Sequence, residues 1–360
     1  MKISIVGGGP AGLYFASSVK KLNPSFNVTV YEAKNESIAA YGLGYTFQVL
    51  GSYLLERLDP KFFTNLFGSE PRQKIKTAIL KTNEESQTHS FTDGYSVTRR
   101  EMMRYLINLA KDNGVRVKEK KVTASFLKSL QQSSDLLVGA DGVNSLVRKA
   151  YADEFGAAAK KTELRYSWFT NESPEPIKQA CFYAFKAEEG VILLTSYPLT
   201  EKQQVVIIEM TQDCLQSGLL RGKSPEQAIP YLNEVLGSNG GEIDLQASGL
   251  PWYEFKMNTS TRLFYNNVVL IGDAAFALHF GAGQGLTTAF TMGHTLASCL
   301  QRTKNLKQAL THYSQSTQML MHKPARQSEA QVQWLEQMDT HCAAHSGVDL
   351  LTLFGKKMAH

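Results

Sequence analysis

The feature that most constrains this chain is a glycine-rich turn near its start, set between an apolar run and a helical pattern. Residues 2–6 predict a short buried strand, residues 11–22 a helix and residues 27–31 a second strand. A strand, a helix and a further strand in this order form a βαβ unit, whose two strands lie parallel in one sheet. We therefore expect the chain to open with a parallel α/β sheet.

The turn itself has the spacing Gly-x-Gly-x-x-Gly, at Gly7, Gly9 and Gly12. The first glycine permits a tight turn off the strand, the second lets the backbone approach a pyrophosphate, and the third lets the helix pack close to the strand. The helix starts where Pro10 and Ala11 lie, and its N-terminus offers free N–H groups and the positive end of its dipole. The turn predicts a dinucleotide site; a glycine loop that only turns the chain is the alternative.

An acidic residue completes this fingerprint. Glu32 ends the second predicted strand, about 20 residues after Gly12, where a carboxylate can bind both hydroxyls of an adenosine ribose. The same carboxylate repels a 2′-phosphate. We therefore expect an adenosine with a free ribose here.

Two later strands end in similar signals. Residues 135–138 form an apolar run that leads into Gly139-Ala-Asp141-Gly, and residues 268–271 lead into Gly272-Asp273. Ligands of open α/β sheets bind at the carboxyl ends of the strands. Asp141 and Asp273 are therefore expected at the same edge of the sheet, with Asp273 placed to bind a sugar-alcohol hydroxyl.

The middle of the chain changes character. Residues 180–185, 191–197 and 204–210 are rich in β-forming residues and are separated by turn signals, which predicts an antiparallel sheet. Residues 99–112 and 284–300 predict helices, as do residues 304–338. The parallel-sheet lobe is therefore discontinuous, with a second lobe inserted into it.

This pattern predicts α/β architecture with an α+β second lobe: a Rossmann-type, dinucleotide-binding parallel-sheet domain, an inserted antiparallel-sheet substrate domain and C-terminal helices. The expected bounds are 1–65, 95–155 and 259–300 for the dinucleotide-binding domain, 66–94 and 156–258 for the substrate domain, and 301–360 for the helical segment.

The three glycine-and-acid segments together resemble the class A FAD-dependent aromatic-ring monooxygenases, which share the p-hydroxybenzoate hydroxylase fold. The resemblance implies FAD as cofactor, NAD(P)H as co-substrate, and hydroxylation of an aromatic or indole-like molecule by O2 through a flavin C4a-hydroperoxide. It implies that Asp141 lies near FAD and the NAD(P)H path, that Asp273 binds the ribityl or pyrophosphate region, and that Arg99 faces the flavin. A helix-terminal surface charge is the alternative for Arg99, and its neighbour Arg100 is a second candidate.

The loop from Gly281 to Gly285 precedes a helix, so N–H groups around Gly283 and Gly285 are expected to stabilise negative charge on a reduced flavin. Seven aromatic residues of the inserted lobe are available to cover the ring with apolar surface, and plain core packing is the alternative for each one singly: Trp168, Phe169, Phe182, Tyr183, Phe185, Trp252 and Phe255.

A narrower resemblance, to the violacein-pathway tryptophan-derivative hydroxylase and the salicylyl-CoA and aminobenzoyl-CoA hydroxylases, covers nearly the whole chain. Its segments are Gly42 to Phe47, Tyr166 to Trp168, His279-Phe280, and Trp334 to Glu336. The chain departs from the wider family at Phe276, which usually is His, at Phe280, which usually is Pro, and at Thr287, which often is Asn.

His279 and Phe280 are the expected catalytic pair, because His279 is the titratable residue expected nearest the ring. It could bind substrate or act as a general base on a phenol or indole. A buried structural histidine is the equal alternative. His341 and His345 have the spacing of two metal ligands on one helical face, but no carboxylate-rich set accompanies them, so no metal is predicted.

Other functions are excluded or kept open. The net charge of +5 arises from scattered basic residues, which does not predict nucleic-acid binding. No apolar stretch has the length of a membrane span, and four distant cysteines fit a reducing cytoplasm. We expect a monomer or homodimer. An FAD oxidoreductase that inserts no oxygen and a non-catalytic binding protein of the same fold remain alternatives.

Overall fold

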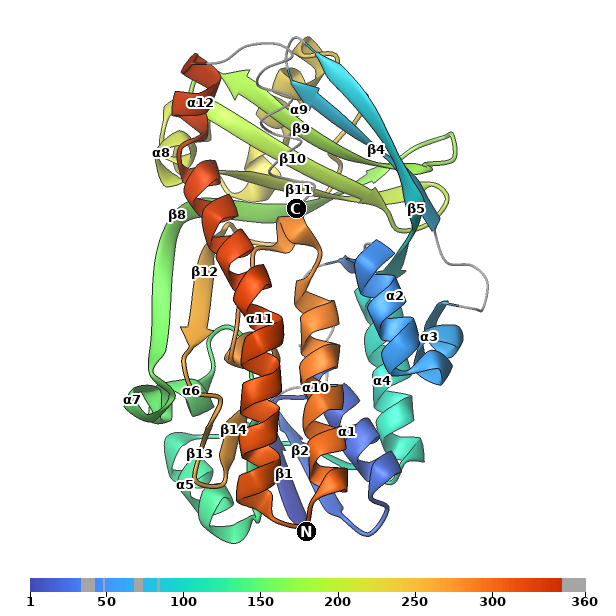
Figure 1. Ribbon diagram of the computed structural model, residues 1–360. Coiled ribbons are helices and arrows are strands. Elements are labelled where there is room, and N and C mark those ends of the chain that lie inside the picture. The colour runs from blue at the N-terminus through green and yellow to red at the C-terminus, as the bar shows by residue number, and fades with distance from the viewer. Residues whose placement is uncertain (34–42, 48, 68–73, 83–84, 345–360) are drawn as a thin grey trace.

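The computed structural model describes residues 1–33, 43–47, 49–67, 74–82 and 85–344. Figure 1 shows two lobes, a lower one around a parallel sheet and an upper one around a second sheet, with the long helix α11 (Leu306–Glu336) running along both. Within the described residues, none of the helices combines the length and hydropathy that crossing a bilayer requires.

The lower lobe contains a six-stranded sheet in the order β13-β14-β7-β1-β2-β6. Five strands are parallel, and β13 pairs antiparallel with β14 at the edge. The bounds are β1 (Lys2–Val6), β2 (Asn27–Glu32), β6 (Arg116–Glu119), β7 (Leu136–Gly139), β13 (Phe264–Tyr265) and β14 (Val268–Leu270). The strands β7, β1 and β14 are apolar and almost fully buried, as parallel strands covered on both faces must be.

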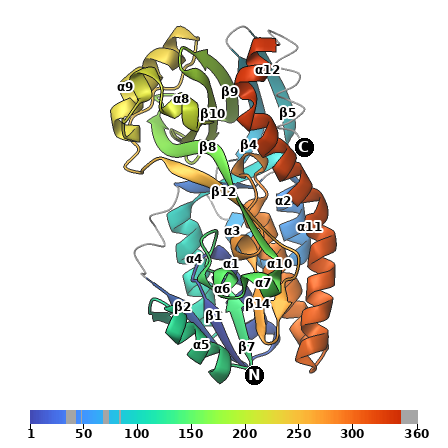
Figure 2. The ribbon, with the colours of Figure 1, turned by 90° about the vertical axis from the view of Figure 1, so that its left-hand side faces the viewer.

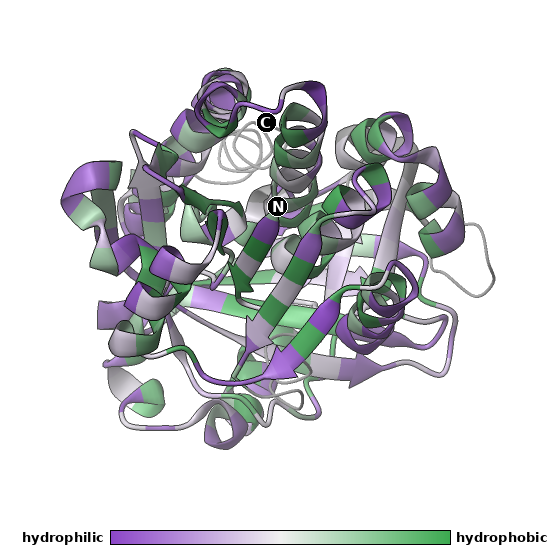
Figure 3. Cartoon of the chain, turned by 90° about the horizontal axis from the view of Figure 1, so that it is seen from below, coloured by the Kyte–Doolittle hydropathy of each residue, from purple (hydrophilic) through white to green (hydrophobic). Residues whose placement is uncertain are grey.

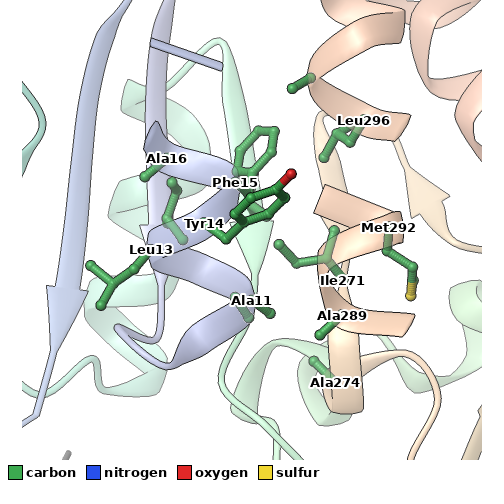
Figure 4. Packing of buried hydrophobic residues seen from close by; sticks show 14 of the residues in the cluster. Ala11, Leu13, Tyr14, Phe15, Ala16, Ile271, Ala274, Ala289, Met292 and Leu296 are labelled. Atoms are coloured by element: carbon green, nitrogen blue, oxygen red, sulfur yellow. The ribbon is translucent and has the colours of Figure 1, made fainter. Parts of the chain in front are cut away.

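Helices α1 (Pro10–Leu22) and α10 (Gly285–Arg302) pack against each other beside this sheet. In the close view of Figure 4, Tyr14 and Phe15 of α1 point toward the α10 side, where Met292 and Leu296 lie. Small residues at Ala11 and Ala289 let the two helices approach. Figure 3 shows the same region from below, with hydrophobic residues on the strands and on the surrounding helices.

Six further helices, two of them short, belong to this lobe and its connections. The helix α4 (Arg99–Asp112) begins with a capping box in which the Thr98 hydroxyl accepts the Glu101 N–H and the Glu101 carboxylate accepts the Thr98 N–H. The others are α2 (Val49–Leu58), α3 (Pro60–Phe67) and α5 (Ala124–Ser133), with the short α6 (Leu146–Ala150) and α7 (Ala152–Phe155) following β7.

The upper lobe contains an eight-stranded sheet in the order β12-β8-β11-β10-β9-β4-β5-β3. Its pairs are antiparallel except β4 with β9. The bounds are β3 (Gly44–Phe47), β4 (Lys74–Thr82), β5 (Ser86–Thr98), β8 (Ala157–Glu172), β9 (Gln179–Ala187), β10 (Gly190–Pro198), β11 (Gln203–Thr211) and β12 (Tyr253–Ser260). One face packs on α9 (Pro225–Ser238), with α8 (Gln212–Leu215) beside it, as Figure 2 shows from the side.

The helix α11 joins the two lobes. Its first half, including Leu310 and Tyr313, packs into the core of the lower lobe, and its last turns, including Trp334, pack against the upper sheet. Gln337 ends α11, and α12 (Met338–Ala344) follows, so the expected helix over 304–338 ends two residues early.

The predicted fold class is confirmed: a parallel sheet interrupted by a largely antiparallel one. The strands β3, β4 and β5 were not predicted from the sequence, and β3 joins the upper sheet although it lies within residues 1–65. Both β5 and β12 continue across the expected domain bounds, so the division into domains stays a prediction. Residues 345–360 of the expected helical segment lie outside the described residues.

Candidate active site

The loops that follow β1 and β7 meet at the end of the parallel sheet. Gly7 has φ +104°, and a Cβ there would overlap the carbonyl oxygen of Ala140 and the Cα of Asp141. A Cβ on Gly12 would in turn overlap the carbonyl oxygen of Gly7. The glycine at position 7 therefore lets the Gly7-x-Gly-x-x-Gly12 turn pack directly against the Gly139-Ala-Asp141 loop.

The loop after β14 packs against the loops that follow β1 and β7, through Ala11 and Arg148. A Cβ on Gly272, whose φ is +61°, would lie 2.8 Å from the Cβ of Ala11. The buried Arg148 guanidinium donates to the carbonyl oxygens of Ala274 at 2.8 Å and Val143 at 2.6 Å. Three loops separated along the chain thus form one unit, with Arg148 as the bridge between the second and the third.

Two helix N-termini are open at this unit. Gly9 precedes α1 and Gly285 begins α10, and a Cβ added at either would meet no atom within 4 Å. No side chain caps either helix, and the first turn of each lacks an acidic residue. Their N–H groups and positive dipole ends are therefore available to an anionic ligand.

Glu32 lies at the end of β2 beside the first of these helices. One carboxylate oxygen accepts the Gly8 N–H at 2.6 Å, and the other accepts the Ala33 N–H at 2.8 Å. A carboxylate oxygen can accept more than one hydrogen bond, so each keeps capacity for a hydroxyl donor. The backbone thus fixes the orientation of Glu32 and leaves it able to bind a diol.

Asp141 lies against Gly7, but its carboxylate binds its own loop. One oxygen accepts the Ser145 hydroxyl at 2.5 Å, and the other accepts the N–H groups of Leu146 at 2.6 Å and Val147 at 3.2 Å. Burial raises the pKa of Asp141, while these hydrogen bonds act in the opposite direction. This geometry makes Asp141 the N-terminal anchor of α6; direct contact with a cofactor stays a prediction.

Asp273 occupies an accessible but enclosed position. Its side chain is exposed to solvent, yet the surrounding protein raises its pKa to about 6, against the opposing effect of Arg148 and Arg99. The solvent exposure of the side chain makes Asp273 available to a ligand at the carboxyl end of β14.

Arg99 rather than Arg100 faces this region. Arg99 is half-buried and donates to the hydroxyl of Tyr45, with the guanidinium carbon 5.5 Å from the ring centroid, whereas Arg100 is exposed. Neither Tyr45 nor Tyr197 was predicted from the sequence as a site residue. Burial raises the pKa of both phenols, and the Tyr197 hydroxyl donates to the Gly44 carbonyl at 3.1 Å. Arg99 and Tyr197 each contact β3, which brings them together with Tyr45. Gly42, which begins the expected Gly42 to Phe47 segment, lies outside the described residues.

His279 is buried and both of its ring nitrogens are bound within the protein. The Gly281 N–H donates to Nδ1 at 3.1 Å, so the ring proton is assigned to Nε2, which lies 2.8 Å from Oε1 of Glu209. The backbone N–H of His279 donates to the Ser328 hydroxyl at 2.7 Å. The geometry favours the buried structural histidine over the general base.

Phe280 stacks on His279, with ring centroids 4.5 Å apart, and contacts Tyr166 of the upper sheet at 4.9 Å. It is half-buried and lies between the glycine loop and the sheet. Phe280 thus connects the two lobes at the site. Its direct part in catalysis stays a prediction.

The inner face of the upper sheet, which faces the lower lobe, is aromatic. Its half-buried members are Tyr166, Trp168, Phe182 and Tyr253. Of the aromatic residues expected to cover the ring, Trp168 and Phe182 lie on this face and Phe255 contacts His279. The remaining four pack on the opposite face around α9: Phe169, Tyr183, Phe185 and Trp252.

Two departures from the wider family lie in packed surroundings. Phe276 is buried in the core of the lower lobe. The Thr287 hydroxyl lies against Gly51 of α2, since a Cβ on that glycine would be 2.5 Å from it.

The His341 ring stacks on Trp334 at 5.0 Å, and His345 lies outside the described residues. Among the described residues no group of three potential metal ligands occurs.

A comparison with known sequences decides the family. The pattern of the FAD binding domain family matches residues 81–328, more than half of the chain. The chain is a member of the FAD binding domain family. The predicted cofactor is thereby confirmed as FAD.

Similar members carry hydroxylase or monooxygenase names. Salicyloyl-CoA 5-hydroxylase from Streptomyces sp. is 23% identical over 93% of this chain, which spans 65% of that protein's length. Protodeoxyviolaceinate monooxygenase from Chromobacterium violaceum is 23% identical over 88% of this chain and 83% of its own length. The resemblance drawn from the motifs is confirmed at the level of the family.

Solved structures of the same fold include 2-methyl-3-hydroxypyridine-5-carboxylic acid oxygenase, with a TM-score of 0.73 at 18% identity over 93% of this chain and 92% of that chain. PqsL from Pseudomonas aeruginosa, a probable FAD-dependent monooxygenase, has a TM-score of 0.73 at 15% identity over 94% of this chain and 97% of that chain. These likenesses confirm the fold.

Proposed function

We propose that this FAD binding domain protein is a monooxygenase that hydroxylates an aromatic or indole-like small molecule with NAD(P)H and O2. The observation that carries the proposal is the single unit made by the loops after β1, β7 and β14, opposite an aromatic sheet face. The hydroxylase and monooxygenase names of its relatives support the same reaction class.

The residues at this unit fit FAD. Open space beside Gly9 and the uncapped start of α1 suit the pyrophosphate, Glu32 suits the adenosine ribose, and Asp273 suits a hydroxyl of the ribityl chain. The open N-terminus of α10, with Gly283 and Gly285, would face the ring. When bound, reduced FAD supplies the activation of O2 that an aromatic carbon requires.

The protein's own contribution is placement and the exclusion of water. Tyr166, Trp168 and Phe280 offer apolar surface above the glycine loop, which keeps water from the reacting atoms. Among the motifs of this chain there is one strand–glycine–helix fingerprint, so we propose that NAD(P)H binds transiently near the ring instead of in a domain of its own.

We also propose a monomer or homodimer located in the cytoplasm. The four cysteines, Cys181, Cys214, Cys299 and Cys342, are all free, which suits a reducing compartment.

The test uses the purified protein loaded with FAD. NADH or NADPH is added under nitrogen with and without indoles, anilines and phenols, and air is then admitted. We expect a product one oxygen atom heavier than one of the aromatic probes, detected by mass spectrometry. Formation of peroxide alone across the set, or a dehydrogenated product, would instead indicate an oxidoreductase that inserts no oxygen.

A further inference from the structure

Glu209 stands out because a carboxylate is rarely buried. Of the described residues, the buried charged side chains are Arg148, which the mechanism already uses, and Glu209, which is 5% exposed, with His279 beside it. Glu209 lies on β11 and pairs across the sheet with Tyr166 of β8, on the inner face. A buried carboxylate on an otherwise apolar face requires an explanation.

His279 provides a hydrogen-bond partner for one of the two carboxylate oxygens of Glu209. Oε1 of Glu209 accepts from Nε2 of His279 at 2.8 Å, while Nδ1 accepts from the Gly281 N–H. With Nδ1 as an acceptor, Nε2 is the ring nitrogen that donates, and this hydrogen bond occupies only Oε1 of Glu209.

The second oxygen, Oε2, is unused. Within the described part of the chain, no hydrogen bond reaches Oε2. This oxygen is not fully buried either, so it is accessible to solvent. The neighbours on this face, Tyr166, Trp168 and Phe280, are also only half-buried, so the sheet face that carries Glu209 is itself partly open to solvent.

We propose that Oε2 of Glu209 binds the substrate and selects aromatic molecules that present an N–H donor, neutral or cationic, while excluding aromatic carboxylates. The inference rests on the proposed function and names the substrate class of that same site. A carboxylate in an apolar surrounding binds a hydrogen-bond donor strongly and repels an anion. It therefore favours substrates with an N–H group and disfavours substrates with a carboxylate. His279 is a positioning residue, because it holds Oε1 and thereby fixes the direction of Oε2.

The test compares indole with benzofuran, which has the same shape but an acceptor oxygen in place of the N–H, and with benzoate as the anion. Binding to the FAD-loaded protein is followed by the change in flavin absorbance. We expect indole to bind roughly tenfold or more tightly than benzofuran, and benzoate to bind weakest, as a hydrogen bond to a charged group implies.

Glu209→Gln is the decisive variant because it preserves the buried contact. The amide oxygen can accept from Nε2 of His279, which leaves the amide NH2 where Oε2 was, so an acceptor becomes a donor. We expect the indole-to-benzofuran preference to fall to one or below and benzoate binding to improve. Glu201→Gln, at an exposed turn, is the matched control and should keep the preference of the unchanged protein.

Three results would overturn the inference: benzoate as the tightest probe, equal or undetectable binding of indole and benzofuran, or a preference unchanged in Glu209→Gln. The ranking in the unchanged protein decides the matter even where the variant does not fold. FAD content and the mass of the product are measured separately, so a failure of this inference differs from a failure of the proposed monooxygenase activity.

Discussion

The two sides of the candidate active site are built from different parts of the chain. On the lower side, backbone groups make the site: glycines, helix N-termini and carbonyl oxygens held by Arg148. On the upper side, side chains of a sheet make it: Tyr166, Trp168 and Glu209. The lower side therefore tolerates no added atom where its loops meet, at Gly7, Gly12 and Gly272, whereas the upper side can exchange side chains and so change what it accepts.

The largest effect should come from adding one methyl group on the lower side. Gly7→Ala would force a Cβ into the carbonyl of Ala140 at φ +104°. We expect a loss of stability above about 3 kcal/mol and loss of bound FAD, measured by urea unfolding and flavin content.

The matched control is Gly237→Ala, in α9, where the added Cβ meets nothing within 4 Å. A helical Gly→Ala change should stabilise by up to about 1 kcal/mol. A Gly7→Ala protein that is stable and retains yellow FAD would contradict the claim that close backbone packing at Gly7 forms the lower side of the site.

Next in size is Arg148→Met. Its removal leaves the carbonyl oxygen of Ala274 without its side-chain donor and takes one of two donors from the carbonyl of Val143, which keeps the Asn258 amide at 2.6 Å. We expect destabilisation by about 2–4 kcal/mol and weaker FAD binding, followed by thermal unfolding and by fluorescence titration with FAD. Arg148→Lys keeps the charge but not the forked geometry and should recover only part of both. Full recovery by lysine would mean that charge, rather than the bridge between two loops, is what matters.

Asp273→Asn should have a smaller effect that depends on pH. The carboxyl pKa of about 6 lies above its ordinary value of 3.8, so the folded protein takes up a proton near pH 6 that the unfolded chain does not. The contribution of Asp273 to the stability of the FAD-free protein should therefore rise as the pH falls from about 7 toward 4, while FAD affinity falls because the protonated acid is a poorer acceptor. Asp273→Asn should remove both trends. Parallel pH curves for the two proteins would show that Asp273 is not the group responsible.

The smallest effects should separate the two faces of β8. Trp168 points toward the site and its neighbour Phe169 packs under α9. Trp168→Phe should change the KM of an aromatic substrate with little change in stability. Phe169→Leu should cost about 1 kcal/mol of stability and leave KM unchanged. The two measurements are initial rates and urea unfolding. The same change in KM in both variants would contradict the assignment of Trp168 and Phe169 to opposite faces of the sheet.

Local signals were enough to predict the lower side. The turn at Gly7 to Gly12, the helix from Arg99 to Asp112 and the strands before Asp141 and Asp273 all follow from short-range periodicity and spacing. The contacts between them, such as Arg148 with Ala274, were not predictable, because they join residues far apart in the chain.

The upper side was harder to predict for the same reason. Strand alternation shows that Trp168 and Phe169 face opposite ways, but not which of them faces the ligand. The pairing of Glu209 with His279 joins a strand to a distant loop, and no motif marks it. Residues 44–47 and 74–98 carry weak strand signals, so their place in the upper sheet depends on tertiary pairing.

The helix α11 also has a mechanical consequence. Pro324 lies near the end of the stretch that packs on the lower core, which reaches Ala325, and precedes the stretch from Val332 that packs on the upper sheet. It leaves the carbonyl of Leu320 without its helical donor. Stiffness is therefore lowest at this turn, and any hinge motion that admits a ligand between the lobes should bend there. Crystal structures with and without an aromatic ligand would reveal such a change as a difference in kink angle at Pro324.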